Sequence, residues 1–199
     1  MDFTDSTIWL IQTFFTIYLI VLWLRILLPS THTSSLNPIA ILVRRLSNFI
    51  IEPIYKIVPH VKYIDYVTLI ILFLVDLIQL YLVGYLQTGQ LLNFFAICLW
   101  SVAQILSLLF SIFICSIILC VLLSWMSIFK HRYYPLQEVL EHLSAPMLKP
   151  IQSVIPIVGR LDFSPIIALL MLFAVEYLLF GPMVKYAILL AFNSSVDVL

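Results

Sequence analysis

Two carboxylic acids stand inside stretches that are otherwise apolar enough to cross a membrane. Asp76 lies at the centre of one stretch, and Glu176 lies within another. Ionisable groups are costly in hydrocarbon, so acids at this depth indicate either a binding site or a structural bond. A shift of 97 residues along the chain carries Gln79, one helical turn from Asp76, onto Glu176. The spacing predicts polar groups on about the same face, at about the same depth.

Two interpretations of these residues fit the sequence. In the first, Asp76, Gln79 and Glu176 contribute to a cation or proton site between two halves of the protein. In the second, each acid is protonated and hydrogen-bonded to a neighbour, or is paired with a basic residue to hold helices together. Arg25, near the end of the first apolar stretch, is long enough to extend toward Asp76.

The sequence contains no motif of a common enzyme class. It has only four glycines, whereas phosphate-binding loops and nucleophile elbows depend on glycine. None of the three cysteines forms a C-x-x-C motif, and no two histidines are four residues apart. We therefore expect no enzyme activity, no cofactor and no metal site. A formal net charge of zero also argues against nucleic-acid binding, which requires a clustered basic surface.

The composition around these acids requires lipid as a solvent. Hydrophobic residues make up 63% of the chain and charged residues 10%, against about a quarter charged in soluble domains. Apolar runs cover about residues 8–28, 66–86, 105–125 and 164–182, and each is long enough to cross a bilayer core as a helix. The expected fold class is all-α, a polytopic membrane protein with four transmembrane helices.

An internal repeat divides the chain into two similar units. The 97-residue shift aligns prolines, a glycine and an aspartate without a gap, which chance rarely does. The matched pairs are Pro38 with Pro135, Pro53 with Pro150, Pro59 with Pro156, Asp65 with Asp162 and Gly84 with Gly181. We expect a first repeat at 1–86, a second at 105–183 and a tail at 184–199. The apolar linker at 87–104 is either an interfacial helix or an extension of the third span.

The repeat and the basic residues set the expected orientation. Each repeat contains two spans, so both copies share one orientation about an axis along the membrane normal. The loops at 29–65 and 126–163 are basic, whereas the N-terminal tail and the linker have no Lys or Arg. The positive-inside rule then places both loops in the cytoplasm and both termini outside. We expect Gly84 and Gly181, near the outer ends of their spans, at close helix contacts.

Each basic loop begins with an amphipathic segment. Asn37 and Pro38 fit the N-cap and the first position of a helix, and the run PIAILVRRLSNFII mixes apolar residues with arginines. Its copy, PLQEVLEHLSAPML, has Glu138, Glu141 and His142 on the polar side. Two placements are open for these helices: on the inner leaflet, or packed over the cytoplasmic ends of the spans.

Prolines follow in the second half of each loop. They are Pro53, Pro59, Pro150 and Pro156. Because proline lacks a donor and disrupts a regular helix, we expect the helices to stop there and extended or turned chain to follow. Asp65 and Asp162 stand just before the returning spans, where an acid can cap the helix N-terminus. The alternative for this pair is binding to a cation or a partner.

These loops resemble the signature of the YggT family. The pattern L-S-x-P-x-x-x-P-I-x-x-x-I-P-x-x-x-x-x-D-x-S-P is complete from Leu143 to Pro165. The first copy, 46–68, is similar, with Phe49 at the early proline position and Val67-Thr68 in place of Ser-Pro. The motif residues are Pro53, Pro59, Asp65, Leu143, Ser144, Pro146, Pro150, Pro156, Asp162, Ser164 and Pro165. Two tandem copies are similar to the longer bacterial members of the family.

The resemblance implies an integral protein of the bacterial inner membrane without an established enzymatic activity. Family members have been linked to osmotic tolerance and potassium homeostasis, and others to cell division or nucleoid distribution. Plastid relatives assist haem attachment in the cytochrome b/f complex.

Two functions are therefore expected as alternatives. One is a non-enzymatic accessory or assembly protein whose loops dock membrane proteins or lipid headgroups. The other is a small potassium or proton transport protein that uses the intramembrane carboxylates. The expected partners are the lipid bilayer and either another membrane protein or further copies of the chain. Because one chain of four helices leaves little room for a pore, transport would require an oligomer.

Overall fold

The computed structural model describes residues 3–31, 33–55, 65–90, 92–127, 135–154 and 164–193. Over these residues the chain forms helices and no strand, which confirms the all-α prediction. The elements are α1 (Phe3–Ser30), α2 (Pro38–Tyr55), α3 (Tyr66–Thr88), α4 (Phe94–Ser127), α5 (Pro135–Val154), α6 (Ser164–Val175), the π-turn η1 (Glu176–Phe180) and α7 (Gly181–Asn193). In this part of the chain, four helical stretches are long and apolar enough to cross a membrane: α1, α3, α4 and the continuous run from α6 to α7.

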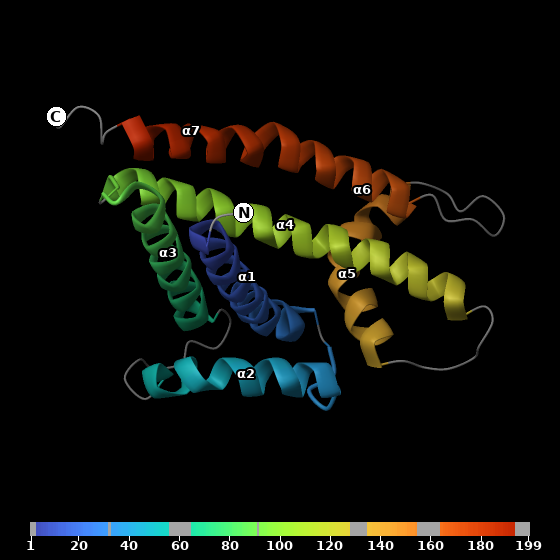
Figure 1. The fold of residues 1–199 in the computed structure, drawn as a ribbon. Coiled ribbons are helices and arrows are strands. Elements are labelled where there is room, and N and C mark those ends of the chain that lie inside the picture. The colour runs from blue at the N-terminus through green and yellow to red at the C-terminus, as the bar shows by residue number, and fades with distance from the viewer. Residues whose placement is uncertain are drawn as a thin grey trace.

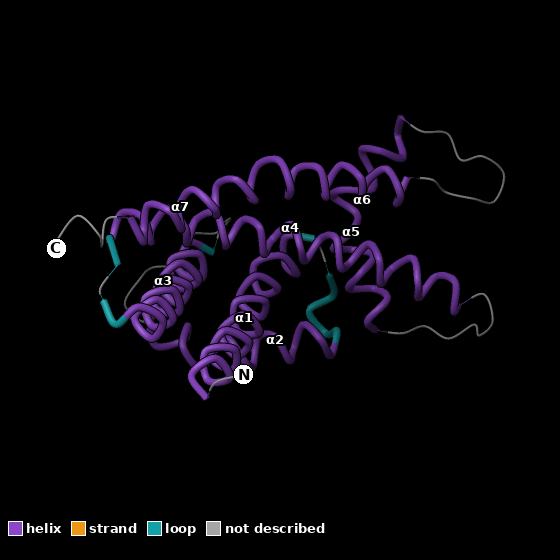
Figure 2. The backbone as a smooth tube through the Cα atoms, turned by 45° about the horizontal axis from the view of Figure 1, so that its top comes forward, coloured by secondary structure: helices purple, strands orange, loops and turns teal. Residues whose placement is uncertain are grey.

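The candidate spans pack as two pairs that meet at α4. α1 packs against α3, while α4 runs beside α6, η1 and α7 (Figures 1 and 2). α3 also contacts α4 and so joins the two pairs. α2 lies across the ends of α1 and α3 (Figure 1), and α5 packs against α4 and α6. Each pair therefore carries its own connecting helix.

α2 contacts the spans through one face. Ala40, Val43, Ser47 and Ile51 are buried and recur every three or four residues, which is the spacing of one helix face. Ile51 belongs to a core cluster that also contains residues of α1, α3 and α4. The helix thus packs over the ends of the spans, which is one of the two placements open for it.

The linker between the repeats is an extension of the third span. α4 has 34 residues and begins at Phe94, inside the segment 87–104. At 1.5 Å per residue it is about 50 Å long, which exceeds the ~30 Å core of a bilayer. A helix of this length must tilt or project beyond the hydrocarbon.

The fourth span continues past 182, where we expected it to end. α6, η1 and α7 form one helix to Asn193, so residues 184–193 belong to the helix and not to a tail. Pro182 has no N–H, and its ring would collide with the carbonyl four residues earlier in a regular helix. The π-turn removes this conflict, because the Gly181 N–H bonds the Glu176 carbonyl five residues back.

Two prolines lie inside helices that we expected to stop at them. α2 continues past Pro53 to Tyr55, and α5 continues past Pro150 to Val154. Proline inside a helix costs about 3 kcal/mol. Packing of the opposite face, as at the fully buried Ile51, offsets this cost and keeps the last turn helical. The other two prolines of the set, Pro59 and Pro156, lie outside the described residues.

A close contact forms at only one of the two matched glycines. A Cβ at Gly84 would overlap the Leu92 side chain, which lies just before α4. At Gly181 the nearest atom to an added Cβ is the Glu176 carbonyl oxygen of its own helix, at 3.8 Å. Gly84 therefore makes a close contact, as predicted, but with a residue before α4 and not with a helix, and the prediction is wrong for Gly181, which belongs to the π-turn.

The two connecting helices meet at their N-terminal ends. Asn37 caps α2, as predicted, because its Oδ1 accepts the Ile39 N–H at 2.9 Å. Its side-chain amide also donates to the Pro135 carbonyl and to Glu138 Oε2 of α5, both at 2.9 Å. A single side chain therefore both starts α2 and ties it to the other repeat.

An apolar cluster and a histidine reinforce this joint. The cluster consists of Leu28, Ala40, Val43, Val139 and Leu143, which come from α1, α2 and α5. His142 Nδ1 lies 2.7 Å from the Thr31 carbonyl at the end of α1. The predicted polar side of α5 thus includes two residues, Glu138 and His142, that contact the first repeat.

Replacement of Asn37 by Ala should destabilise the protein more than the loss of a simple helix cap. The cap is worth about 1 kcal/mol, and the acceptors on α5 lose their donor at a further cost of about 1 kcal/mol. Asn93→Ala is the matched control, because Asn93 caps α4 through the Phe95 N–H at 2.9 Å. Thermal unfolding in detergent should show the larger loss for Asn37→Ala; equal losses would contradict the cross-repeat role.

Candidate functional site

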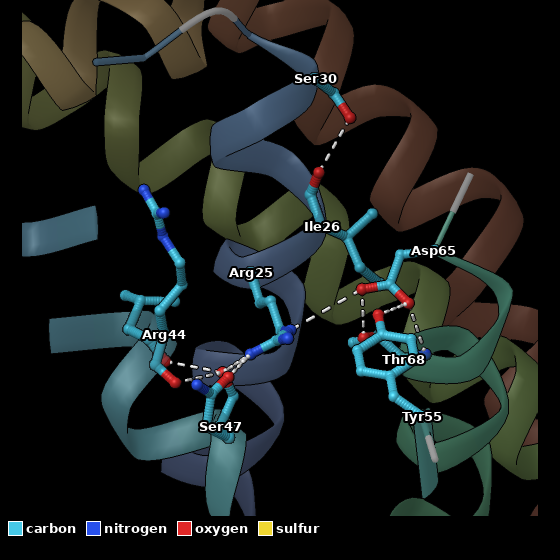
Figure 3. A network of polar contacts seen from close by, with 10 residues as sticks. Arg25, Ile26, Ser30, Arg44, Ser47, Tyr55, Asp65 and Thr68 are labelled. Carbon is cyan, nitrogen blue, oxygen red and sulfur yellow. Dashed lines mark hydrogen bonds and ion pairs between the residues drawn. The ribbon is translucent and has the colours of Figure 1, made fainter. Parts of the chain in front are cut away.

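A polar network joins α1, α2 and α3 at the end of the spans where α2 lies (Figure 3). The Arg25 guanidinium donates to Ser47 Oγ at 2.7 Å and to Asn48 Oδ1 at 2.5 Å, both on α2. Its Nε lies 3.7 Å from Asp65 Oδ2, just before α3. Its Cζ lies 5.8 Å from the centroid of the Tyr55 ring. One arginine of α1 therefore contacts both helices that follow it.

This placement corrects the expected extension of Arg25 toward Asp76. Along α3, Asp76 is about 16 Å beyond Asp65, at 1.5 Å per residue. The Arg25 side chain is already held by Asp65 and α2, so it cannot reach that depth. Arg25 therefore belongs to the network at the helix ends and not to the intramembrane polar site.

Asp65 caps α3, as predicted, and is also the acid of the network. Its Oδ1 accepts the Thr68 N–H at 3.1 Å and a hydrogen bond from the Tyr55 hydroxyl, and its Oδ2 accepts the Thr68 hydroxyl. Burial by itself raises the pKa of Asp65. The hydrogen bonds from Thr68 and Tyr55, with the Arg25 charge, outweigh burial and hold that pKa below its ordinary value. The carboxylate is therefore ionised and serves as counter-ion to Arg25.

Tyr55 completes the network from the last turn of α2. Burial and the hydrogen bond to Asp65 raise the pKa of the Tyr55 hydroxyl, so it stays protonated and donates. Nothing in the sequence pointed to Tyr55 or Asn48, because neither stands at a motif position. The role of Tyr55 follows from the continuation of α2 past Pro53, and that of Asn48 from the packing of α2 against α1.

The second repeat lacks the arginine of this network. The position that matches Arg25 holds Leu122 in α4. The position that matches Thr68 holds Pro165, which has neither an N–H nor a hydroxyl to donate. Asp162, the copy of Asp65, lies outside the described residues. The two repeats have corresponding helices, but different polar contacts hold these helices together.

Asp76 is fully buried, and its neighbours lie on α4. Its Oδ1 accepts from Gln104 Nε2 at 3.2 Å, and the Ser101 side chain lies beside the same carboxyl. Gln79, one turn along α3, is 4% exposed. Asp76 Oδ2, Gln79 Oε1 and Ser101 Oγ are buried without a hydrogen-bond partner. The structure thus brings Asp76 and Gln79 together with two residues from the segment between the repeats.

Glu176 meets the same helix further along. Its Oε1 accepts from Ser107 Oγ at 3.3 Å and from Ser111 Oγ at 3.2 Å. Ser101, Gln104, Ser107 and Ser111 recur every three or four residues and form one polar line, the α4 stripe. The partners of the two acids are about 10 Å apart along α4. Asp76 and Glu176 therefore share one helix but lie at different levels along it.

The described motif residues lie in and at the ends of the helices. Leu143 and Ser144 are buried on one face of α5, and Ser164 is buried where α6 begins. The motif prolines of the described chain are Pro53, Pro146, Pro150 and Pro165, all within helices. These positions indicate that the motif shapes the two connecting helices and the start of the returning span.

Removal of the Asp65 carboxylate should destabilise the protein in proportion to what each variant loses. Asp65→Ala removes the α3 cap, the acceptor of Tyr55 and the counter-ion of Arg25, which should cost about 3 kcal/mol. Asp65→Asn keeps a capping oxygen and should lose about half as much. Denaturant unfolding in detergent measures both, with the exposed Asp5→Ala as control. An unchanged Asp65→Asn variant at pH 7 would contradict the role of the charge.

The same carboxylate gives stability an acid limit. The folded pKa of Asp65 lies below the unfolded value of about 3.9, so its contribution is fully present above that pH. It is lost as the pH falls through the folded pKa. The stability difference between wild type and Asp65→Asn should therefore narrow below about pH 4.

Comparison with known proteins places this architecture in a family. The CCB3/YggT family model matches residues 4–86 and again 99–183. An uncharacterized protein of Pseudomonas aeruginosa is 28% identical over 177 residues, which cover 87% of this chain and 87% of that protein. The uncharacterized protein YggT of Escherichia coli K12 is 28% identical over 172 residues, which cover 86% and 88%. No solved structure matches the chain. With the family model matching most of its length and with four candidate spans, this chain is a multi-pass membrane protein that belongs to the CCB3/YggT family.

Proposed function

We propose that this chain is a non-enzymatic accessory protein of the bacterial inner membrane that works through α2 at the cytoplasmic leaflet. The observation that carries this proposal is the exposure of α2: Phe49 is 87% exposed, whereas Ile51, two residues on, is fully buried. The low glycine count also argues against phosphate-binding or nucleophile-elbow chemistry. Complex assembly and osmotic tolerance, which the family resemblance implies, are both roles of this class.

α2 has three faces that differ in character. The first packs on the spans. The second, called here the outer face, consists of the exposed residues Leu42, Leu46, Phe49 and Ile50. The third is polar and carries Arg44, Arg45 and Glu52, with the exposed Ile41 between the two arginines on the helical wheel. A helix that borders protein, hydrocarbon and water at once requires three such faces.

The outer face fits the inner leaflet of an anionic membrane. α2 lies across the ends of the spans α1 and α3 (Figure 1), where hydrocarbon gives way to headgroups. Arg44 and Arg45 beside an apolar face match anionic lipid headgroups, at about 1 kcal/mol for each charge. Arg44 also donates to the Ser35 carbonyl at 2.9 Å, which orients its side chain.

This position of α2 agrees with the proposed orientation of the chain. The positive-inside rule puts the basic loops, and with them α2 and α5, in the cytoplasm, and both termini outside. The exposed apolar faces of the spans then remain available to lipid, to a partner membrane protein or to further copies of the chain.

A second candidate function is the transport of potassium or protons. The α4 stripe supports it, because this one line of hydroxyls and an amide contacts both intramembrane acids, Asp76 and Glu176. Glu176 also opens the π-turn η1, and π-turns are frequent at functional sites. Four spans in one chain leave little room for a pore, so an oligomer would be the conducting unit.

A carboxylate on the outer face of α2 should abolish the accessory function without removing the protein from the membrane. Phe49→Glu places a negative charge against hydrocarbon and anionic headgroups. Ile41→Glu is the matched control, because it places the same charge on the polar face of the same helix. In a strain lacking its own copy, growth at high osmolarity should fail with Phe49→Glu and persist with Ile41→Glu. Equal growth of both strains would contradict a role for the outer face.

The transport candidate makes a separate prediction. Purified protein reconstituted in liposomes should pass potassium, and the Asp76→Asn, Glu176→Gln double variant should fall to the rate of protein-free vesicles. Glu52→Gln, on the polar face of α2, is the control and should conduct like wild type. Absence of flux in a folded wild-type preparation would contradict conduction by the isolated protein and favour the accessory role.

A further inference from the structure

Three buried oxygen atoms between α3 and α4 make no hydrogen bond of good geometry, although the Ser101 hydroxyl lies within reach of the Asp76 carboxyl. They are Asp76 Oδ2, Gln79 Oε1 and Ser101 Oγ. Their side chains are at most 4% exposed, so water outside the protein does not reach them. Asp76 and Gln79 are one turn apart on α3, and Ser101 lies beside the Asp76 carboxyl on α4. Because a buried polar atom without a partner is destabilising, three within the same part of the α3–α4 contact require an explanation.

The missing partner of these oxygen atoms must supply a positive charge or hydrogen-bond donors. Two of the three atoms, the carboxylate oxygen and the amide oxygen, are acceptors. The other carboxylate oxygen, Oδ1, already receives the Gln104 amide at 3.2 Å. Among the described residues, the ion pair that forms is Arg25 with Asp65, and it leaves no arginine for Asp76. An ionised Asp76 at this depth therefore needs a counter-ion that the surrounding helices do not provide.

The oxygen set matches one class of ion. Carboxylate, amide and hydroxyl oxygens are hard ligands, whereas thiolate and imidazole select transition metals. No group of three or more His, Cys, Asp or Glu occurs in the described part of the chain. One carboxylate balances one positive charge, since the other acid, Glu176, is held by Ser107 and Ser111 instead. A monovalent cation thus fits the charge of the site, and a divalent one would be left uncompensated.

We propose that Asp76, Gln79 and Ser101 bind a single alkali-metal cation between α3 and α4. The cation is bound by Asp76 Oδ2, Gln79 Oε1 and Ser101 Oγ. Gln104 is a positioning residue, because its amide fixes the other carboxylate oxygen and so the direction of Oδ2. The cation would be the ligand of Asp76, which is one of the two acids that the proposed transport function uses. The site does not depend on conduction, since a bound cation can also tie α3 to α4 as a structural element.

Cation-dependent stability of the full chain tests this site. The purified protein in detergent is unfolded by heat in choline chloride, and NaCl, KCl or LiCl then replaces choline at constant ionic strength. The melting temperature should rise with at least one alkali cation and saturate with its concentration, as ligand binding requires. A melting temperature that is the same in choline and in all three alkali salts would overturn the proposal and would leave Asp76 as a protonated structural acid.

Variants separate the site from general salt effects. Asp76→Asn should lose the alkali-dependent shift, while Glu176→Gln, which changes the other intramembrane acid, should keep it. Ser101→Ala, a small change that the fold tolerates more readily, should raise the half-saturating concentration about tenfold for one lost oxygen ligand. A shift that persists in Asp76→Asn and Ser101→Ala would overturn the assignment to these residues.

The melting experiment and the flux experiment test the cation site and the transport function separately. An alkali-dependent shift with no potassium flux would uphold the cation site and remove the transport candidate. Flux that depends on Glu176, without any alkali-dependent shift, would uphold transport and overturn the site at Asp76.

Discussion

Hydrocarbon offers no hydrogen bonds, so each polar group within the spans needs a partner inside the protein or a bound ion. Most of the polar contacts between the helices follow from this constraint. Asp76 and Glu176 both accept hydrogen bonds from the α4 stripe. Pro182 is accommodated by a π-turn, which keeps the chain helical. α4 is consequently the element that both repeats share, although it begins in the segment between them.

At the ends of the spans, the ionised groups also find their partners inside the protein. Arg25 is anchored on one side by Ser47 and Asn48 and on the other by Asp65, so a single charge pair fixes the position of α2 over α1 and α3. Because the second repeat has Leu122 at the matching position, it must hold α5 by other contacts. Those contacts include Asn37 and Thr31 of the first repeat. The two copies are thus not independent units: α5 packs on α4 and α6 of its own repeat and also bonds to the first repeat.

This division bears on function. α2 presents an exposed apolar outer face, which under the proposed function meets the headgroups, while the α3–α4 boundary contains three buried oxygens without hydrogen bonds of good geometry. The first feature suits an accessory role at the leaflet, and the second suits a bound ion. Along α3, Asp65, which contacts α2 through Tyr55, is about 16 Å from Asp76, so substitution at one site should leave the other intact.

The sequence by itself determined the all-α class, the four spans, the repeat, the caps at Asn37 and Asp65, and the family. These features depend on composition, on local patterns, on the 97-residue repeat and, for the family, on a motif resemblance, and none of these requires knowledge of packing. Only the tertiary structure decided that Arg25 pairs with Asp65 and not with Asp76, that Gly181 forms no close contact, and that helices pass through Pro53, Pro150 and Pro182. The reason lies in the spans themselves, because α1 and α6 have no distinct polar face. A helix of this kind carries no periodic signal for which face meets its neighbour, so the partners of its few polar residues are fixed only when the helices pack.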